Sequence, residues 1–226
     1  MDSALPRVAV LCGGAGSRLG ELTKDLPKPM IAIGGRPYLE RVVDSFSERG
    51  FGEFVFLTGF RHDVIESHFG DGARFGVSVT YSREIEPLGT GGAVREARPL
   101  LGSRFILTYG DVLRRFDYDR FVQRHPRNCV AAYPRIAAGN TAVEGGLVVV
   151  YDKRSPDLPY IDAGFSVMHS DVLDMLPASG ACSFEEIVFP LLAAERELEC
   201  EVVDHDFFDI GTPDELQRTR AALEDR

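Results

Sequence analysis

The N-terminal region of the chain holds a glycine-rich loop and two cations at a spacing suited to binding phosphate. An apolar segment, residues 8–11, runs into the sequence CGGAGSRL at residues 12–19, and Lys28 follows between two prolines. Glycine backbones approach a phosphate closely because no Cβ stands in the way. Arg18 and Lys28 supply cationic donors for the same oxygens. The pattern predicts a triphosphate site at the end of a first β-strand.

Two other phosphate-binding loops do not match this run of glycines. A dinucleotide-binding G-x-G-x-x-G loop that starts at Gly14 needs a third glycine where the chain has Leu19. A P-loop needs a Gly-Lys pair, and this pair does not occur in the chain. For the glycines alone, a tight strand-to-helix turn without a ligand stays open as an interpretation.

Two carboxylates that follow or interrupt apolar segments are candidates for holding a divalent metal. Asp111 comes just after the segment 105–109, and Asp209 lies in the run FFDIGTP at residues 207–213. A buried carboxylate is costly unless it is paired or metal-bound, and Mg²⁺ is usually held by carboxylates together with substrate phosphates. Asp111 and Asp209 would share one Mg²⁺ if both segments end at the same cleft. For Asp111 alone, a role in a turn or helix cap is the competing interpretation.

Two further segments could serve the same cleft. Glu84 and Glu86 precede PLGTGG at residues 87–92, where a helix begins whose N-terminal amides would face an anion. The two acids could accept hydrogen bonds from a nucleotide base, although a solvated loop explains them equally well. Lys153 follows the apolar segment 147–151 and matters only if that segment ends at the cleft. A solvated surface lysine is the alternative.

Two other sets of polar residues are interpreted without a catalytic role. Asp117 and Asp119 formally match the D-x-D of metal-dependent glycosyltransferases, but they lie directly before a helical pattern. Helix capping and first-turn charge explain them better. His62, His68 and His125 fall on helical segments without metal-ligand spacing.

Composition places the chain among acidic globular proteins. Its 226 residues carry a formal net charge of −10 and are 44% hydrophobic and 27% charged, which fits one α/β domain over residues 1–226. The acidic balance predicts no nucleic-acid partner, because polyanion binding needs a basic face. The four scattered cysteines indicate buried free thiols in a reducing compartment. No apolar stretch approaches the ~20 residues of a membrane span, so we expect no membrane partner and a cytoplasmic location.

Short apolar segments alternate with amphipathic segments, which is typical of an α/β protein with a Rossmann-like sheet. The predicted strands are 7–11, 54–58, 77–81, 105–109, 130–133, 147–151 and 164–168. The predicted helices are 38–49, 62–69, 91–100, 118–125, 184–195 and 213–223. Ligands in such sheets bind beyond the carboxyl ends of the strands. The polar residues that follow the strands are therefore the ones expected to act.

The order of these motifs resembles that of the sugar-1-phosphate nucleotidyltransferase family. The shared segments are GGAGSRL (13–19), LPKPM (26–30), PLGTGGA (87–93), Gly110-Asp111 and DIGTP (209–213), which span nearly the whole chain. Within the family, the region from His68 to Thr90 is most similar to the short enzymes typified by D-glycero-α-D-manno-heptose-1-phosphate guanylyltransferase. The resemblance implies the nucleotide-diphospho-sugar transferase fold, a Rossmann-like mixed, mainly parallel sheet flanked by helices.

The resemblance also implies an activity. A Mg²⁺-dependent enzyme would combine an NTP with a sugar 1-phosphate to give an NDP-sugar and pyrophosphate, and a homodimer is expected. The acidic pair favours GTP, and a heptose 1-phosphate is the implied acceptor. A uridylyl- or cytidylyltransferase acting on another sugar, a cyclitol or a non-sugar phosphate stays open. So do a catalytically silent nucleotide-binding module and a metal-dependent glycosyltransferase.

Carried over residue by residue, the resemblance assigns roles to the candidates. Arg18 would neutralise the leaving pyrophosphate, Lys28 would contact the α-phosphate, and Asp111 with Asp209 would hold the metal. A sugar phosphate is already an anion, so in-line attack needs positioned cations rather than a strong general base. The implied nucleotide-binding residues are Leu11, Gly13, Gly14, Gly16, Ser17, Arg18, Lys28, Glu86, Gly89 and Thr90. The implied sugar-phosphate residues are Lys153, Asp162 (where the family usually has asparagine), Gly164 and, by a loose match in residues 135–146, Asn140.

Overall fold

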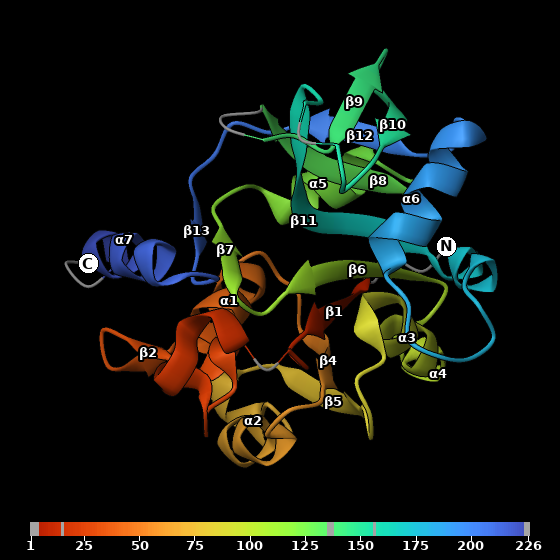
Figure 1. The fold of residues 1–226 in the computed structure, drawn as a ribbon. Helices are drawn as coiled ribbons and strands as arrows, with labels where there is room; N and C mark the ends of the chain where they lie inside the picture. Colours follow the sequence, from red (N-terminus) through yellow and green to blue (C-terminus); the bar gives the residue numbers. More distant parts are fainter. Residues whose placement is uncertain (1–4, 15, 135–137, 156, 224–226) are drawn as a thin grey trace.

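A nine-stranded sheet forms the centre of a computed structural model that describes residues 5–14, 16–134, 138–155 and 157–223 (Figure 1). In spatial order the strands are β5 (Ser78–Arg83), β4 (Glu53–Thr58), β1 (Arg7–Leu11), β6 (Arg104–Tyr109), β11 (Tyr160–His169), β8 (Cys129–Pro134), β12 (Glu199–Val202), β10 (Leu147–Tyr151) and β9 (Thr141–Glu144). In Figure 1 the first four of these fill the lower half of the molecule and the other five the upper half.

The sheet combines parallel and antiparallel pairs. Strands β5, β4, β1 and β6 pair in parallel, and β12 is parallel to β8. Strand β11 runs antiparallel to both β6 and β8, and β10 runs antiparallel to β12 and β9. The expectation of a mixed sheet flanked by helices is confirmed, but the sheet is not mainly parallel: between the neighbouring strands that the structure describes, four pairs are parallel and four are antiparallel.

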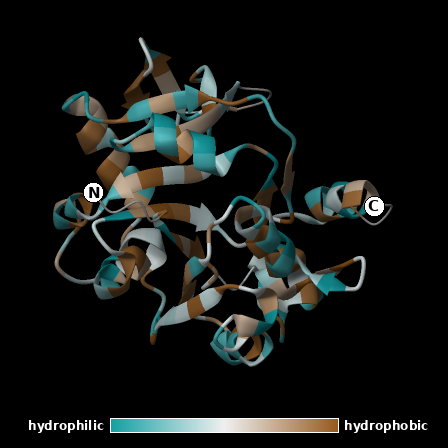
Figure 2. Cartoon of the chain, turned by 180° about the vertical axis from the view of Figure 1, so that it is seen from behind, coloured by the Kyte–Doolittle hydropathy of each residue, from teal (hydrophilic) through white to brown (hydrophobic). Residues whose placement is uncertain are grey.

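Two apolar cores lie on opposite faces of the sheet, because alternate residues of a strand point to opposite sides. In β1, Val8 and Val10 join the first core and Ala9 joins the second. The first core is covered by helices α1 (Tyr38–Ser47), α2 (His62–Phe69), α5 (Tyr118–Arg124) and α7 (Pro213–Leu223). The second is covered by α3 (Gly89–Glu96), α4 (Arg98–Leu101) and α6 (Phe184–Ala194). Figure 2 shows the strands as largely apolar, with hydrophilic residues on the helices around them.

Helix α1 shows how sequence spacing produces this packing. Its apolar residues Leu39, Val42, Val43 and Phe46 recur at intervals of three and four residues, and all of them are buried. Phe46 stacks on Tyr118 of α5, with 4.1 Å between the ring centroids. The amphipathic pattern therefore fixes which face of the helix meets the sheet.

Short elements complete the fold. They are the 3-10 turns η1 (Ser17–Thr23), η2 (Lys28–Met30), η3 (Ala73–Phe75) and η4 (Ser170–Met175), the hairpin of β2 (Ala32–Ile33) and β3 (Arg36–Pro37), and the ribbon of β7 (Val112–Arg114) and β13 (Phe207–Asp209). Tyr38 of α1 contacts both strands of that ribbon. Its hydroxyl donates a hydrogen bond to the Phe208 carbonyl oxygen of β13 at 2.6 Å and accepts one from Leu113 N of β7 at 3.2 Å.

The predicted strands and helices are all present, with three differences. The predicted helix 91–100 is two helices, because Pro99 cannot continue α3 and instead stands in the first turn of α4. The predicted strand 164–168 is the second half of a ten-residue strand that a bulge interrupts. Strands β2, β3, β7, β9, β12 and β13 were not predicted, because each has only two to four residues and no sustained alternation.

The four cysteines are free, as the sequence predicted. Cys12, Cys129 and Cys200 are buried, whereas Cys182 is half-buried beside the glycines of α3. Among the helices that the structure describes, none combines the length and the apolar character needed to cross a bilayer.

Candidate active site

Strand β1 brings the glycine loop to the edge of the sheet. Cys12 N, just after Leu11, donates to a β4 carbonyl oxygen at 2.8 Å, and the chain then leaves the sheet. Gly16 has φ +63°, and a Cβ on it would lie 3.0 Å from Lys28 Cβ, so the turn requires glycine there. A Cβ on Gly14 would meet no described atom within 4 Å. The backbone at Gly14 is therefore open to an approaching ligand.

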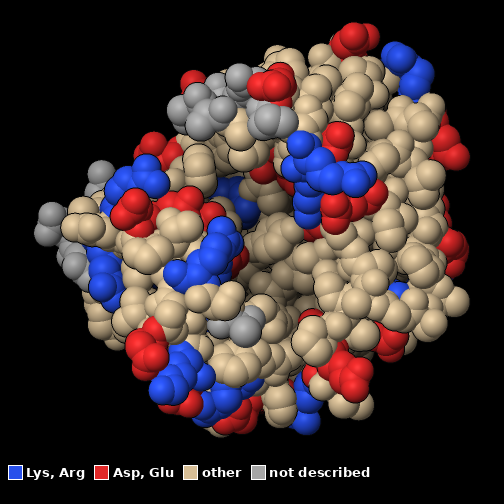
Figure 3. Space-filling model, viewed as in Figure 1, with Lys and Arg blue, Asp and Glu red and all other residues tan. Residues whose placement is uncertain are grey.

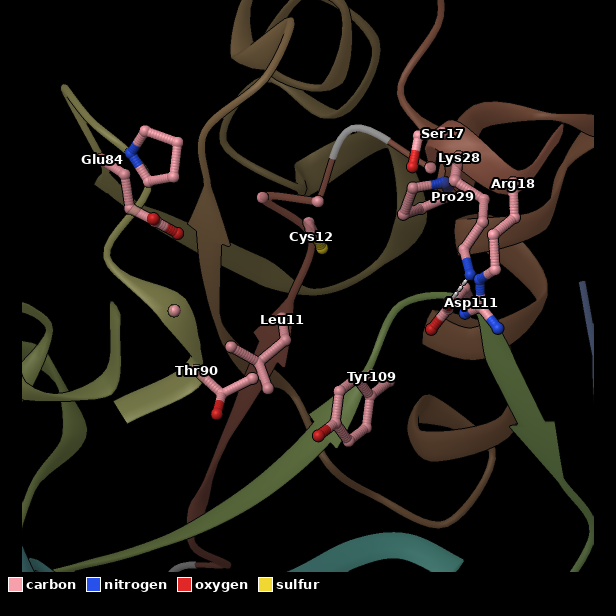
Figure 4. Close-up of a pocket in the computed structure, with 15 residues that line it drawn as sticks. Leu11, Cys12, Ser17, Arg18, Lys28, Pro29, Glu84, Thr90, Tyr109 and Asp111 are labelled. Carbon is pink, nitrogen blue, oxygen red and sulfur yellow. Dashed lines mark ion pairs between the residues drawn. The ribbon is translucent and has the colours of Figure 1, made fainter. Parts of the chain in front are cut away.

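Arg18 and Lys28 converge on Asp111 (Figure 4). Arg18 lies on η1 and Lys28 on η2, and the Lys28 ammonium forms an ion pair with Asp111 Oδ2. Lys28 is only 9% exposed, so its charge lies in a poorly solvated position. Pro27 and Pro29 restrict the backbone on both sides of it. The two cations are thus positioned together before any phosphate binds.

Asp111 and Asp209 lie side by side, because the β7–β13 ribbon joins the segments that carry them. Ile210 N donates to the Asp111 carbonyl oxygen at 3.3 Å, and Asp209 is in register with the residue after Asp111. Burial, and then repulsion from Asp111 and Glu215, raise the pKa of Asp209. Two carboxylates that repel each other beside a phosphate-sized cleft form a donor set that fits a hard divalent cation.

Two adjoining cavities open at this edge of the sheet. The first has a volume of about 420 Å³ and the second about 300 Å³, and Arg18, Tyr109 and Asp111 line both. Nine of the residues expected to bind nucleotide line the first cavity: Leu11, Gly13, Gly14, Gly16, Ser17, Arg18, Lys28, Gly89 and Thr90. Asp162, Gly164 and Asp209 line the second. Of the four residues expected to bind the sugar phosphate, Asp162 and Gly164 therefore line the second cavity, whereas Asn140 and Lys153 line neither cavity.

Glu84 faces the first cavity, whereas Glu86 is exposed and lines only a neighbouring one (Figure 4). Glu84 Oε2 accepts a hydrogen bond from Leu88 N at 2.7 Å. A Cβ on Gly13 would lie 2.6 Å from Glu84 Oε1, so this oxygen lies against the glycine loop. Burial raises the pKa of the Glu84 carboxyl. Of the two acids, Glu84 is better placed to meet a base, while the role expected for Glu86 stays a prediction.

The first turn of α3 is packed tightly against the segment before α6. Gly89 has φ +68°, and a Cβ on it would lie 2.5 Å from the Cys182 carbonyl oxygen. That carbonyl accepts a hydrogen bond from Gly91 N at 2.8 Å, and Thr90 Oγ1 accepts one from Phe184 N at 2.9 Å. The first turn of α3, which lines the first cavity, is therefore hydrogen-bonded to the start of α6.

A bulge in β11 shapes the second cavity. The register between β11 and β8 shifts between Asp162 and Ser166, and Gly164 within it has φ +64°. Asp162 Oδ1 accepts from Gly164 N at 2.7 Å, and Asn140 Oδ1 accepts from Asp162 N at 2.9 Å. Burial raises the pKa of Asp162 to about 6. Asn140 thus supports the bulge, and Asp162 stabilises it while lining the cavity. Residues 135–137 of the expected sugar loop lie outside the described residues.

Arg114 lies beneath this bulge, although nothing in the sequence pattern singled it out. It is 1% exposed, and its Nη1 donates to Thr108 Oγ1 at 3.1 Å. Within the described residues its buried Nη2 has no hydrogen-bond partner, and a Cβ on Gly164 would lie 2.8 Å from it. Only glycine at that position leaves room for the guanidinium. In sequence, an arginine pair after Asp111 looks like an ordinary surface turn.

The side chain of Lys153 lines neither of the two cavities and points to Glu185. Its Nζ is 3.0 Å from Glu185 Oε2 and donates to Ser183 Oγ at 3.4 Å. Glu185 is buried and also accepts from the Tyr109 hydroxyl. Sequence reasoning could not single out Glu185, because an acid in the first turn of a helix is usually explained by the helix dipole.

The face that carries the cleft is deeply hollowed, and lysine and arginine side chains stand around the hollow (Figure 3). Arg18 and Lys28 belong to this cleft, although the chain as a whole has a formal net charge of −10. Glu84, Asp111, Asp162 and Asp209 line the same cavities, so the cleft as a whole does not carry a net positive charge. Arg18 and Lys28 can therefore act on an anionic ligand as individually positioned donors.

Two polar groups lie outside this cleft. Asp117 occupies the N-cap position of α5, as expected, but makes no side-chain capping bond and pairs with Arg49 instead. His125, Cys129 and Glu199 place one possible ligand atom each within 4.8 Å of one another. Both ring nitrogens of His125 already meet carboxylates, at 2.8 Å from Glu199 and 2.7 Å from another glutamate of β12, which accounts for the group without an ion.

Comparison with known proteins relates this chain to nucleotidyltransferases. A family model described as "Nucleotidyl transferase" matches residues 7–144. The mannose-1-phosphate guanylyltransferase of Mycobacterium tuberculosis is 31% identical over 229 residues, which cover 95% of this chain and 63% of that protein. This chain therefore spans less than two thirds of the length of that relative.

Two further relatives match nearly end to end. The D-glycero-alpha-D-manno-heptose 1-phosphate guanylyltransferase of Campylobacter jejuni is 28% identical over 211 residues, covering 91% of this chain and 95% of that protein. The crystal structure of HddC from Yersinia pseudotuberculosis superimposes with a TM-score of 0.84 at 24% identity, covering 97% of this chain and 100% of that one. The superposition confirms the expected nucleotide-diphospho-sugar transferase fold.

Proposed function

The chain belongs to the sugar-1-phosphate nucleotidyltransferase family, and we propose that it transfers a guanylyl group from GTP to a heptose 1-phosphate, giving an NDP-sugar and pyrophosphate. One observation carries the proposal. Arg18, Lys28 and Asp111 converge at the junction of two cavities, one lined by the glycine loop and the other by the β11 bulge. Two anionic substrates bound in these cavities would meet at the cations.

The catalytic requirement is mainly electrostatic. Attack of one phosphate on another brings two anions together and leaves charge on the departing pyrophosphate, so positioned cations lower the barrier. Lys28 is poorly solvated, and charge interactions are stronger there than in water. Arg18 offers a planar guanidinium that suits bidentate phosphate contact. We assign Lys28 to the α-phosphate and Arg18 to the pyrophosphate.

The paired acids support a divalent metal. Asp111 and Asp209 would hold Mg²⁺, which when bound neutralises phosphate charge. Burial, and then repulsion from Asp111 and Glu215, raise the pKa of Asp209, and a bound cation would relieve the repulsion. In the protein itself Lys28 already balances one of the two carboxylates. The Mg²⁺ requirement is testable by chelation, with Mn²⁺ as the alternative metal.

The preference for guanine rests on Glu84. Its Oε1 lies against the glycine loop at the first cavity, and its Oε2 is occupied by Leu88 N. A carboxylate accepts hydrogen bonds, and guanine offers adjacent N–H donors from its ring and its exocyclic amino group. The relatives from Mycobacterium tuberculosis and Campylobacter jejuni described above are both guanylyltransferases. Glu84→Gln is expected to weaken selection for GTP over the other three NTPs.

The acceptor is proposed from the second cavity and from the length of the match. The cavity of about 300 Å³ lies at the lower end of volumes for small-molecule sites. The match to the Campylobacter heptose enzyme runs almost end to end. Asp162, which stands where the family usually has asparagine, adds a carboxylate acceptor for sugar hydroxyl groups.

Pyrophosphate release with Mg²⁺ tests the proposal directly. Each of the four NTPs would be paired with a panel of hexose and heptose 1-phosphates, and Asp111→Asn would serve as the inactive control. Release that requires GTP and a heptose 1-phosphate is the expected result. Release with another pair would keep the family reaction and correct the substrates. Absence of release with retained NTP binding by calorimetry would instead point to a silent nucleotide-binding module.

A further inference from the structure

The carboxylate of Glu185 lies where the two sides of the cleft meet. It stands in the first turn of α6 and is 2% exposed. Its Oε2 accepts from Thr90 Oγ1 at 2.8 Å, from Ser183 Oγ at 2.9 Å and from Lys153 Nζ at 3.0 Å. Its Oε1 accepts from the Tyr109 hydroxyl. Four donors from four positions in the chain therefore surround one buried carboxylate.

The partners of Glu185 come from elements that serve different parts of the cleft. Thr90 opens α3 and lines the first cavity. Tyr109 ends β6, two residues before Asp111, and lines both cavities. Lys153 follows β10 and is the residue expected to meet the sugar phosphate. Glu185 therefore makes hydrogen bonds to the first turn of α3, to the end of the strand that leads to Asp111, and to the lysine expected to meet the sugar phosphate.

The electrostatics hold Glu185 in its charged form. Burial by itself would raise its pKa, but the Lys153 charge and the Tyr109 and Thr90 hydrogen bonds outweigh burial and lower it. The position in the first turn of α6 adds the favourable field of a helix N-terminus. A carboxylate has about four acceptor sites, and the donors around Glu185 occupy them. No donor has to come from a substrate.

Lys153 needs such an anchor. Its side chain is 35% exposed, and a lysine carries considerable rotamer freedom that must be lost before its charge can be positioned. The chain has three lysines: Lys24, Lys28 and Lys153. Lys28 is fixed by Asp111, whereas the Lys24 side chain is 66% exposed. Glu185 gives Lys153 the fixed position that Lys24 lacks.

We propose that Glu185 is a positioning residue that couples the two substrate sides of the cleft by holding Lys153 and Thr90 in one geometry. The inference rests on the proposed function for the identity of the two sides. Glu185 acts through its neighbours and contacts neither substrate. Its contribution is orientation, because the charge of Lys153 is useful only at a fixed distance from the phosphates bound on the Thr90 side.

Kinetics of Glu185→Gln test this role. The variant keeps the shape and removes the charge, and we expect kcat/KM for the sugar phosphate to fall by up to about 100-fold. In a Lys153→Met background the same substitution is expected to cost little, because the interaction is already lost. Glu186→Gln, on the exposed neighbouring position of α6, is the matched control. Equal losses from Glu185→Gln with and without Lys153 would overturn the proposal.

A second readout does not depend on activity. In protein that contains isotope-labelled lysine, NMR should show two distinct signals for the two Hε protons of an immobilised Lys153. The two Hε protons of the exposed Lys24 should give nearly the same signal. Glu185→Gln is expected to make the Lys153 protons equivalent as well. If that variant does not fold, Glu185→Asp carries the same test, because the shorter side chain cannot reach both Lys153 and Thr90. An unchanged Lys153 signal in the folded variant would overturn the proposal.

The two readouts separate the failure of this inference from that of the proposed function. A wild-type protein that releases no pyrophosphate with any substrate pair would refute the proposed function, while the NMR comparison would still decide whether Glu185 holds Lys153. An active wild type whose Glu185→Gln variant keeps both the kinetics and the NMR signal of the wild type would refute the inference alone.

Discussion

Lys28→Ala is the most informative single substitution in this protein. It removes the ammonium that pairs with Asp111 and leaves that carboxylate beside Asp209 with no lysine to balance it. The substitution should therefore act twice. It should lower turnover, because a positioned charge is lost, and it should lower stability, because two carboxylates are left to repel each other.

The magnitudes follow from the burial of the pair. Loss of one preorganised charge donor costs about 2.7–4 kcal/mol in the transition state, or about 100- to 1000-fold in kcat. Breaking a fully buried ion pair costs about 3–5 kcal/mol. The Lys28 and Asp111 side chains are 11% and 18% exposed, so we expect a smaller stability loss of about 2–3 kcal/mol. For a chain of this length that loss lowers Tm by roughly 4–10 °C.

Two assays follow from this reasoning. Pyrophosphate release would give kcat and KM, and thermal unfolding with and without millimolar Mg²⁺ would give stability. Because a divalent cation can balance the carboxylates that Lys28 no longer neutralises, Mg²⁺ should restore part of the lost Tm. Lys24→Ala, which removes an exposed lysine shortly before Lys28 in the chain, is the control and should change neither kcat nor Tm. An effect confined to KM for the sugar phosphate, with kcat unchanged, would refute the role given to Lys28.

Three further predictions concern other parts of the cleft. Asp111→Asn should abolish turnover while far-UV circular dichroism stays that of the wild type, and near-normal activity would contradict the metal assignment. Gly14→Ala should raise KM for the NTP but leave Tm unchanged, because a Cβ at Gly14 meets open space. Gly16→Ala should lower Tm, because it strains a residue at φ +63°. Equal Tm values for the two variants would contradict the different roles given to these glycines. Asp162 has a folded pKa of about 6, above its ordinary value of 3.8. The folded state therefore binds the extra proton, and wild-type stability should fall relative to Asp162→Asn as pH rises from about 4 to about 6. Once Asp162 is fully deprotonated, the change in its contribution to the free energy of unfolding amounts to up to about 3 kcal/mol. Chemical denaturation of both proteins at several pH values measures this, and a difference in unfolding free energy that stays constant with pH would refute the reasoning.

Several features of the site could be predicted from local sequence, because local chemistry alone imposes them. The glycine-rich loop at residues 13–16, the prolines around Lys28 and a carboxylate after an apolar strand at Asp111 are each visible in the local sequence. The strand 7–11 and the helix 213–223 were predicted with the bounds that the structure shows. Long elements with clear periodicity are determined by their own pattern.

Other features depend on contacts between distant segments. Strands of three or four residues such as β7 and β13 form only because they pair with each other, and that pairing is what brings Asp209 to Asp111. Glu84 and Glu86 look alike in sequence, and only the fold turns Glu84 toward the cleft.

The sequence by itself determined the glycine-rich loop, the candidate cations and acids and the alternation of strands and helices. The tertiary structure alone decided how the two sides of the cleft are joined. Thr90 and Glu185 are 95 positions apart and yet share a hydrogen bond, and Arg114 is buried under a bulge that another strand makes. The reason is physical: a charged residue in a helix turn or a short strand has the same local pattern whether solvent or protein surrounds it. Only packing determines whether its charge is solvated or held inside a site.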